Sequence, residues 1–378
     1  MRQCRKSRRA NSAISMTLLL AVVTTACTTM TAGPDSGQEE TVTHTTTTSS
    51  AVTTGPEPQS TTTTSPAPST TSPEPSTTSA APSTTSPAPS TTLPRPQPVF
   101  SPTSPFNSPI PANPVIDANS QAQVAYLQRE VVADLWEFGI AIYEVDESTT
   151  PVAIECIQRW GRCPLETGLH RVPEDAIPAP GNDGTLVVID WSENRTVEMW
   201  QARQRPDRSW EASWGTTTPL DGSGVPEVFG TGSGISHLAG VVRVSEIAAG
   251  LIPHALVFST NNTCPDEFRE PATKTDGISD RPDCIPEGAR IQLAPSLDVA
   301  ALQLSPAEAA IARALQEYGA YVVDSGGAPI AFYFEIAEDA DKANPGAVYR
   351  ANGLRRDYFD LGAIPWEYLR VLANWDGS

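Results

Sequence analysis

Apolar residues are distributed along this chain in three different ways. Residues 14–23 form one short apolar run near the N-terminus, and large apolar residues are then scarce from Thr41 to about Thr103. From Ser104 onward they return in short periodic segments. A segment with almost nothing to bury cannot offset the entropy cost of folding. The pattern therefore predicts one folded domain, residues 104–378, preceded by a long unfolded segment.

Apolar positions at steps of three and four predict two main helices in this domain. Residues 121–138 place a set of apolar side chains on one helical face, namely Val124, Leu127, Val131, Leu135 and Phe138. A second helix begins at a capping box, Ser305–Glu308, and Gly319 is placed to end it. Shorter helices are expected after Ser245 and after Pro365.

Most of the remaining domain has the pattern of short strands separated by turn residues. The predicted strands are 185–191, 195–202, 209–214, 238–244, 255–260, 289–293, 320–324 and 330–334. A parallel α/β fold is disfavoured, because it needs a helix after most strands. The expected fold class is mainly β, an antiparallel β-sandwich or jelly roll with a few peripheral helices.

The N-terminus has the layout of an export signal. A basic head precedes the apolar run, and the small residues Thr24–Ala26 follow it. A cysteine at this point, Cys27, resembles the lipid-attachment site of a bacterial lipoprotein, with residues 1–26 removed as a signal peptide. An ordinary signal peptide cut nearby is the alternative. The run is too short to span a membrane, which takes about 20 apolar residues.

Residues 27–103 are rich in Thr, Ser and Pro and predict a disordered stalk. The sequence Ser-Pro-Ala-Pro-Ser-Thr-Thr occurs at 65–71 and again at 86–92. Frequent proline keeps such a chain extended. We expect an exported protein, lipid-anchored to the outer face of the cell membrane or otherwise held in the cell envelope, with this segment as its spacer.

The charge balance narrows the classes of partner. The chain has 25 basic and 44 acidic residues, a net charge of -19, and losing the five basic residues before Cys27 leaves 20 against the same 44. This acidity argues against nucleic acid and against polyanionic substrates, which such a surface repels. A neutral glycan, a cation or a basic partner remains open, and solubility alone is the plainer explanation.

The cysteines of the domain form two close pairs in the sequence. Cys156 lies near Cys163, and Cys264 lies near Cys284. In an oxidising compartment this spacing favours two local disulfides. A zinc site is the rival interpretation, but neither pair has CxxC spacing, and the sequence indicates no metal or cofactor.

Tryptophans beside carboxylates give the best lead to chemistry. Trp200 shares a strand face with Glu198, and Trp214 and Asp190 lie on neighbouring strands. An indole ring covers the apolar face of a sugar, and a carboxylate accepts hydroxyl hydrogen bonds. The alternative is that the tryptophans fill the core and the acids lie on a solvated rim.

Glycoside hydrolysis needs two carboxyl groups across one bond. The candidates are Asp190, Glu198, Asp276 and Asp324, with His254 as a proton shuttle and with Lys274 and Arg290 as further substrate contacts. A structural hydrogen bond is the more ordinary role for His254. The glycine-rich run 230–234 lacks the Lys and Ser/Thr of a phosphate-binding loop, so nucleotide binding is disfavoured.

The domain resembles a secreted or lipid-anchored domain of actinobacteria that has no assigned function. The stretches that carry the resemblance are 104–111, 240–243, 254–257, 286–293 and 312–321. The resemblance implies a single domain in the cell envelope and carries over no catalytic residue. We therefore expect an envelope-anchored carbohydrate-active protein, a glycan hydrolase or lyase if it is an enzyme. The alternatives are a non-catalytic glycan-binding or adhesion module and a structural envelope lipoprotein.

Overall fold

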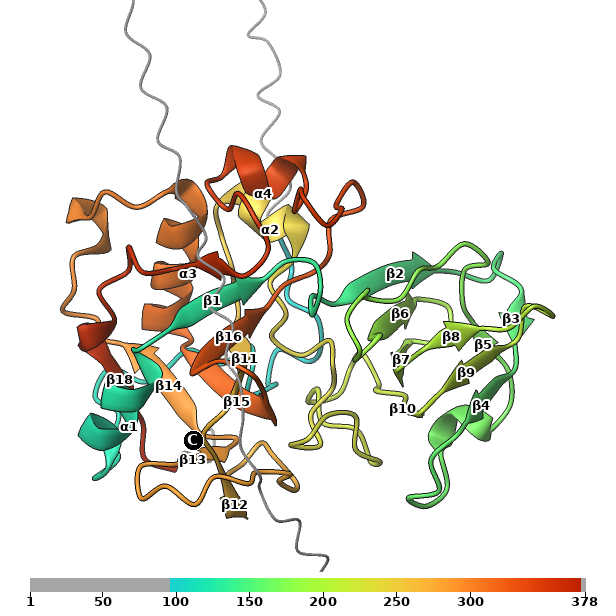
Figure 1. The fold of residues 1–378 in the computed structure, drawn as a ribbon, viewed down its shortest axis with the longest axis horizontal. Coiled ribbons are helices and arrows are strands. Elements are labelled where there is room, and N and C mark those ends of the chain that lie inside the picture. The colour runs from blue at the N-terminus through green and yellow to red at the C-terminus, as the bar shows by residue number, and fades with distance from the viewer. Residues whose placement is uncertain (1–95, 375–378) are drawn as a thin grey trace, which may run out of the picture. The chain divides into compact units, whose positions relative to one another are not determined.

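The computed structural model describes residues 96–374 (Figure 1). The predicted signal peptide, Cys27 and most of the predicted stalk lie outside the described residues. Val99 and Phe100 already pack against the hydrophobic core, so the folded part begins a few residues before Ser104. Within residues 96–374, every helix is too short or too polar to cross a membrane.

A seven-stranded sheet forms one half of the folded part. Its order is β17 (Phe359–Asp360), β1 (Val131–Asp134), β16 (Ile330–Tyr333), β11 (Leu256–Thr260), β15 (Ala320–Ser325), β14 (Arg290–Leu293) and β18 (Leu369–Val371). The pairs β1–β16 and β11–β15 are parallel, and the other neighbours are antiparallel. The sheet is therefore mixed.

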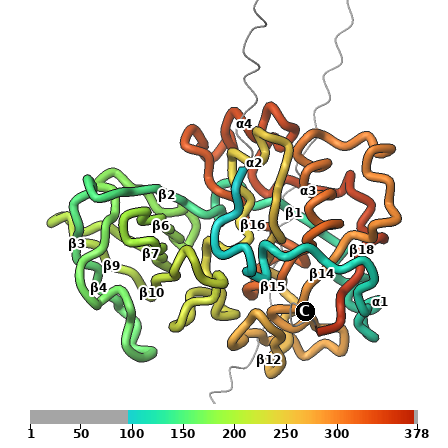
Figure 2. Tube along the Cα trace, turned by 180° about the vertical axis from the view of Figure 1, so that it is seen from behind, coloured from blue at the N-terminus to red at the C-terminus, as the bar shows by residue number. Residues whose placement is uncertain are grey.

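The strands from β2 to β10 gather in a second group, as both views show (Figures 1 and 2). Its main sheet has the order β10 (Trp214–Thr216), β7 (Arg195–Trp200), β6 (Leu186–Asp190) and β2 (Ala141–Val145). The β6–β7 pair is antiparallel and joins the predicted strands 185–191 and 195–202 in a hairpin. The β2–β6 pair is parallel, so this sheet is mixed as well.

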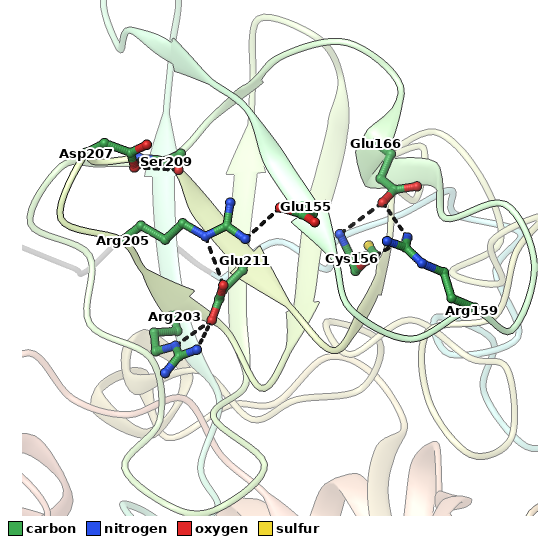
Figure 3. A network of polar contacts seen from close by, with 9 residues as sticks. All are labelled: Glu155, Cys156, Arg159, Glu166, Arg203, Arg205, Asp207, Ser209 and Glu211. Atoms are coloured by element: carbon green, nitrogen blue, oxygen red, sulfur yellow. Dashed lines mark hydrogen bonds and ion pairs between the residues drawn. The ribbon is translucent and has the colours of Figure 1, made fainter.

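Three small sheets complete the strand pairing in the described residues. They are β12 (Thr263–Phe268) with β13 (Ile285–Glu287), β3 (Pro151–Val152) with β5 (His170–Arg171), and β4 (Ile154–Cys156) with β9 (Trp210–Ala212) and β8 (Arg203–Gln204). A chain of ion pairs covers the last of these (Figure 3).

Both predicted disulfides are confirmed. Cys156 is bonded to Cys163, and Cys264 is bonded to Cys284. The first closes a short loop that follows β4. The second joins β12 to the turn before β13, so each bond fixes a loop to a small sheet.

Residues 96–374 contain few helices, and the α-helices lie in the half formed by the seven-stranded sheet (Figure 1). They are α1 (Ser120–Leu127), α2 (Val244–Ala249), α3 (Pro306–Glu317) and α4 (Ala347–Ala351), with single 3-10 turns at Pro164–Glu166, Val299–Ala301 and Trp366–Tyr368. The capping box of α3 forms as predicted, because the Ser305 hydroxyl accepts from the Glu308 N–H while the Glu308 carboxylate accepts from the Ser305 N–H.

The long helix predicted over 121–138 is wrong. The helix ends at Leu127, and Val131–Asp134 is strand β1, paired in parallel with β16. The apolar positions fit both a helix and a buried strand, and the β-branched Val131 and Val132 favour the strand. The correction matters for function, because Asp134 ends this strand.

Two other predicted elements differ from the structure. Residues 238–244 form no strand, and only Val242 makes an isolated bridge, to Phe334. The helix expected after Pro365 is a single 3-10 turn followed by β18. The mainly-β class is confirmed, whereas an antiparallel sandwich or jelly roll is not, since several sheets contain parallel pairs.

Three hydrophobic clusters hold the folded part together. One lies between the helices and the seven-stranded sheet and includes Ile311 and Phe332. Another lies inside the second group of strands. The third contains side chains from both large sheets, among them Val187 of β6 and Val257 of β11. This shared core fixes the two sheets against each other, and the cavity described next is lined by residues of both.

Candidate active site

A cavity of about 920 Å³ is lined by residues of both large sheets and of the loops between them. Its lining divides by chemistry. The second group of strands and its loops supply four of the seven aromatic residues, namely Trp160, Trp200, Trp214 and Phe229. The seven-stranded sheet supplies carboxyl and hydroxyl groups. A large concave site with an apolar wall and a few convergent polar groups is the usual form of a ligand site.

The floor of the cavity is one face of four adjacent strands, β1, β16, β11 and β15. Strand pairing places Asp134 beside Tyr333, and Ser259 beside Asp324. Successive side chains of a strand point to opposite faces. The intervening residues, such as Phe332, belong to the core that packs against α3. The polar residues therefore share the face turned away from the helices.

A β-bulge places Asp324 on this face. The β11–β15 register shifts after Phe258, so that Val323 and Asp324 together oppose Ser259. Such a bulge re-aims the side chains that follow it. Without the extra residue, strict alternation would turn the Asp324 carboxyl toward the opposite face of the sheet.

Asp134 is a buried acid with incomplete hydrogen bonding. Asp134 is 4% exposed, and its Oδ1 has no hydrogen-bond partner among the described residues. Burial, together with the charges of Asp357, Asp183 and Glu137, raises the pKa of this carboxyl to about 7. Asp134 is therefore half protonated near neutral pH, which suits a general acid.

Three further aspartates line the cavity, Asp183, Asp276 and Asp324. Burial and the charge of Asp276 raise the pKa of Asp324 to about 7, with Asp183 adding to the effect. Asp183 thus acts on both Asp134 and Asp324, and its Oδ1 accepts a hydrogen bond from the indole N–H of Trp200 at 3.2 Å. Loop residue Asp183 therefore faces the floor of the cavity from the aromatic side.

Tyr333 contributes a phenol that keeps its proton. Burial raises the pKa of Tyr333 well above its usual value, and the charges of Asp324 and Asp134 add to this shift. A group that stays protonated can donate a hydrogen bond but cannot act as a base. Tyr333 is therefore a donor at the floor of the cavity.

The aromatic wall is a set of stacked rings. Trp160 lies 6.0 Å from Trp200 and 5.7 Å from Trp214 between ring centroids, and Trp214 stacks on Phe229 at 5.2 Å. Trp160 belongs to the loop closed by the Cys156–Cys163 disulfide and is 55% exposed. The wall therefore presents an indole face at the rim that a ligand can cover.

Five of the residues that the sequence places at a site line this cavity: Trp200, Trp214, Lys274, Asp276 and Asp324. The Lys274 ammonium donates a hydrogen bond to the Gly232 carbonyl, and it lies 5.0 Å from the centre of the Phe229 ring. These contacts hold Lys274 along the glycine-rich loop.

Glu198, expected to be catalytic, lies outside the cavity lining and anchors a loop. It is fully buried and accepts hydrogen bonds from the hydroxyls of Thr218 and Ser236, each at 2.6 Å, and from the His237 N–H at 2.7 Å. Burial favours a higher pKa, but the contacts with His237 and the neighbouring hydroxyls hold the pKa of Glu198 below its usual value. The carboxylate thereby positions His237, which lines the cavity.

Asp190 also lies outside the cavity lining. It ends β6, where its Oδ1 accepts from the Ser192 hydroxyl at 2.6 Å and from the Glu193 N–H at 3.1 Å. Its other oxygen pairs with Arg171 at 3.3 Å. These contacts hold the Asp190 carboxylate at the β6–β7 turn, outside the cavity lining.

His254 and Arg290 are likewise placed elsewhere. His254 pairs with Glu246 at 3.0 Å beside a hollow of only about 20 Å³. Burial favours a lower pKa, but the charge of Glu246 raises the pKa of His254 above its usual value. The Arg290 guanidinium donates to the carbonyls of Tyr318 and Ser108, at 2.8 and 2.6 Å. Both residues tie neighbouring segments together.

Sequence reasoning did not identify Asp134, Asp183, Tyr333 or Trp160. Asp134 was hidden inside the predicted helix, although the paired valines before it are a strand signal. Asp183 lies in a glycine-flanked turn, and nothing in its spacing relates it to the others. Trp160 becomes recognisable only when the disulfide loop is placed beside β7 and β10.

Three carboxyl groups at the edge of the floor lie close enough to share a metal ion. They belong to Asp276, Glu287 and Asp324, and one oxygen of each lies within 4.8 Å of the others. Burial and the charge of Asp276 raise the pKa of Glu287 to about 8. The remaining carboxyl of the floor, Asp134, is not part of this group.

Comparison with known proteins adds no assignment. No protein-family model, curated protein or solved structure matches the chain. The resemblance to an actinobacterial envelope domain therefore stays a prediction.

Proposed function

We propose that the protein is an enzyme that hydrolyses a glycosidic bond in a neutral glycan within the 920 Å³ cavity. The observation that supports this most is the pairing of a stacked tryptophan wall with a buried, partly unpaired carboxyl group, Asp134. An aromatic ring binds the apolar face of a sugar, and a carboxyl group that is protonated near neutral pH protonates the leaving oxygen.

Asp134 is the general acid in this proposal, since its raised pKa of about 7 lets it hold a proton at neutral pH. Asp183 is the second carboxyl group. Its charge acts on Asp134, and Trp200 orients it through the indole N–H. Glycoside hydrolysis needs such a pair, one group as acid and the other as base or nucleophile.

The charge of the site selects the class of glycan. Asp134, Asp183, Asp276 and Asp324 all line the cavity, and the only lysine or arginine among its lining residues is Lys274. On the aromatic side of the site, a uronate would meet the charge of Asp183 and of the ionised fraction of Asp134. The raised pKa of Tyr333 also argues against a lyase, because proton abstraction by tyrosine requires a phenolate. Both points favour hydrolysis of a neutral sugar chain.

A glycan-binding module is the second candidate. Trp160 is more than half exposed and stacks on Trp200 at the rim, an arrangement that also suits binding without cleavage. The cavity and its acids favour the enzyme.

We further propose that the protein is exported and anchored in the envelope through Cys27. The two disulfides are compatible with an oxidising, extracellular compartment. Labelling the expressed protein with a fatty-acid probe, with Cys27→Ser as control, tests the anchor. Loss of the label in that variant is the expected result, and a wild-type protein without label would contradict it.

The activity test uses the purified protein with neutral glucans, galactans and mannans, and with a polyuronate as the charged comparison. We expect new reducing ends from one neutral glycan. Asp134→Asn should lower the rate about 100-fold or more. Asp266→Asn, which changes an exposed acid, should not affect it.

Three other results would overturn the hydrolase proposal. Ultraviolet absorbance from unsaturated sugar ends would indicate a lyase. Retarded migration in a polysaccharide gel without new reducing ends would indicate the binding module. Neither cleavage nor retardation across the panel would leave the cavity without a glycan role.

A further inference from the structure

Asp276, Glu287 and Asp324 converge from three separate segments. Asp324 belongs to β15 and Glu287 ends β13, whereas Asp276 lies in the loop that follows β12. One carboxylate oxygen from each lies within 4.8 Å of the other two. Like charges at this spacing repel one another unless they are protonated or share a cation.

Among the ion pairs of residues 96–374, none includes Asp276, Glu287 or Asp324. The nearby Lys274 ammonium is engaged by the Gly232 carbonyl. The cluster therefore differs from the acids elsewhere on the chain that pair with arginine.

Glu287 gives an independent indication of a ligand. The residue is 0% exposed, and its Oε1 has no hydrogen-bond partner in the described part of the chain. Its Oε2 accepts from the Asp276 N–H at 3.2 Å, which fixes the side chain toward the cluster. A buried carboxylate oxygen without a partner is costly unless something binds it.

Gly232 leaves the space that the cluster occupies. A Cβ at this position would overlap the Asp324 carboxylate and would lie 2.7 Å from Oδ2 of Asp276. The absence of a side chain in the glycine-rich loop thus allows two carboxylates to approach each other beneath it.

We propose that Asp276, Glu287 and Asp324 bind a divalent cation of the oxygen-binding class, with Ca²⁺ as the ion of best fit. Carboxylate oxygens are the donors that hard cations prefer. Three oxygens no more than 4.8 Å from one another lie within about 2.8 Å of a common centre. Ca²⁺–oxygen distances of about 2.3–2.6 Å come near this value, whereas Mg²⁺ needs about 2.0–2.1 Å and a near-ideal octahedral geometry.

The site differs from the sequence-based expectation of no metal. The three ligands are spread over 49 positions of the chain, from 276 to 324, so no short sequence motif could predict them. Asp276 and Asp324 also line the cavity, so the ion lies at the cavity edge, where ligand hydroxyls can complete its coordination. Binding of the ion does not depend on the proposed glycan cleavage.

The test is calorimetric titration of the purified, chelator-treated protein with CaCl₂, and separately with MgCl₂, at pH 7.5. We expect Ca²⁺ binding with a Kd of about 1 mM or tighter, and weaker binding of Mg²⁺. The midpoint of thermal unfolding should rise by a few degrees at saturating Ca²⁺. No binding heat and no change in the unfolding midpoint in 10 mM CaCl₂ (~10 times the expected Kd) would overturn the proposal.

Three variants locate the site. Asp276→Asn removes an exposed ligand and should weaken Ca²⁺ binding at least about tenfold without affecting the fold. Glu287→Gln keeps the side-chain shape, and Gly232→Ala disturbs the approach of the two aspartates, so both should weaken binding. Asp266→Asn should bind as the wild type does. Unchanged Ca²⁺ affinity in Asp276→Asn and Glu287→Gln would place the ion elsewhere and contradict the assignment.

Discussion

Two acid-rich regions of this protein differ in the partners of their carboxyl groups. On the three-stranded sheet, Glu211 accepts from Arg203 and pairs with Arg205 at 2.9 Å, and Arg205 also reaches Glu155 at 2.6 Å (Figure 3). On the cavity floor, Asp134 has an oxygen without any partner in the described residues.

The contrast appears in the pKa values. Hydrogen bonds from Arg203 and Arg205 lower the pKa of Glu211, whereas burial among other acids raises the pKa of Asp134 to about 7. Both residues are little exposed, 7% and 4%. What differs is the set of neighbours: arginines that reach solvent in one region, and further acids beneath a cavity in the other. The unpaired acids are therefore the ones available for chemistry or for a cation.

The largest expected effect is on the rate of glycan cleavage at alkaline pH. Asp134 loses its proton above about pH 7, so the rate should fall about tenfold for each further pH unit, to about one hundredth at pH 9. Initial rates from pH 5 to 9 give the profile. Glu211→Gln should leave it unchanged, and a rate that stays level from pH 7 to 9 would remove Asp134 from the role of acid.

The second effect is on stability. An unfolded aspartate titrates near 3.8, but folded Asp134 titrates at about 7. Between these two pH values the folded protein holds a proton that the unfolded chain releases. The contribution of Asp134 to the free energy of unfolding therefore falls as the pH rises toward 7, and it stays constant above pH 7. Between pH 5 and pH 8, the free energy of unfolding should therefore fall by about 2–3 kcal/mol less in Asp134→Asn than in the wild type.

Urea unfolding of both proteins at the two pH values measures this difference. The other charged groups around the carboxyl are Asp357, Asp183 and Glu137, and they remain in the variant. Comparing the two proteins therefore isolates the contribution of Asp134. Equal pH dependence in both would show that the carboxyl is ionised throughout the range.

A third, smaller effect concerns the aromatic wall. Trp160 and Trp191 are each 55% exposed, but only Trp160 lines the cavity. Trp160→Ala should weaken glycan binding about five- to tenfold, because a ring contact contributes about 1 kcal/mol. Trp191→Ala is the matched control and should bind normally. Equal weakening by both substitutions would mean that the sugar contacts a general aromatic surface.

The smallest effect is expected on the paired side of the comparison. Arg205→Ala should lower the unfolding temperature only slightly, because ion pairs near solvent contribute little. The lowered pKa of Glu211 gives stability that is present above about pH 4.5 and lost as pH falls. The difference in unfolding temperature between Arg205→Ala and the wild type should therefore become smaller at acid pH and in high salt. A large loss at pH 7 would show that these pairs are central to the fold.

Much of the fold could be predicted from the sequence. The hairpin of β6 and β7, the capped helix α3 and both disulfides follow from local patterns, and all four occur in the structure. The parallel pairing of β1 with β16 could not be predicted. It joins residues about 200 positions apart in the sequence, and no turn links them.

The site was only partly predictable for the same reason. Trp200, Trp214, Lys274 and Asp276 line the cavity, and their residue types suggested a ligand site. Glu198 has the same residue type as a catalytic acid, but its hydrogen-bond donors come from segments distant in sequence and turn it into an anchor. Residue type alone cannot distinguish a satisfied carboxylate from an unsatisfied one.

The most direct measurement is a carbon-13 NMR titration of the Asp134 carboxyl, assigned by comparison with Asp134→Asn. An apparent pKa of about 7 is the predicted result and would establish an acid that keeps its proton at neutral pH beneath the tryptophan wall. A carboxyl that titrates near 3.8, as an ordinary aspartate does, would contradict the assignment of Asp134 as the proton donor.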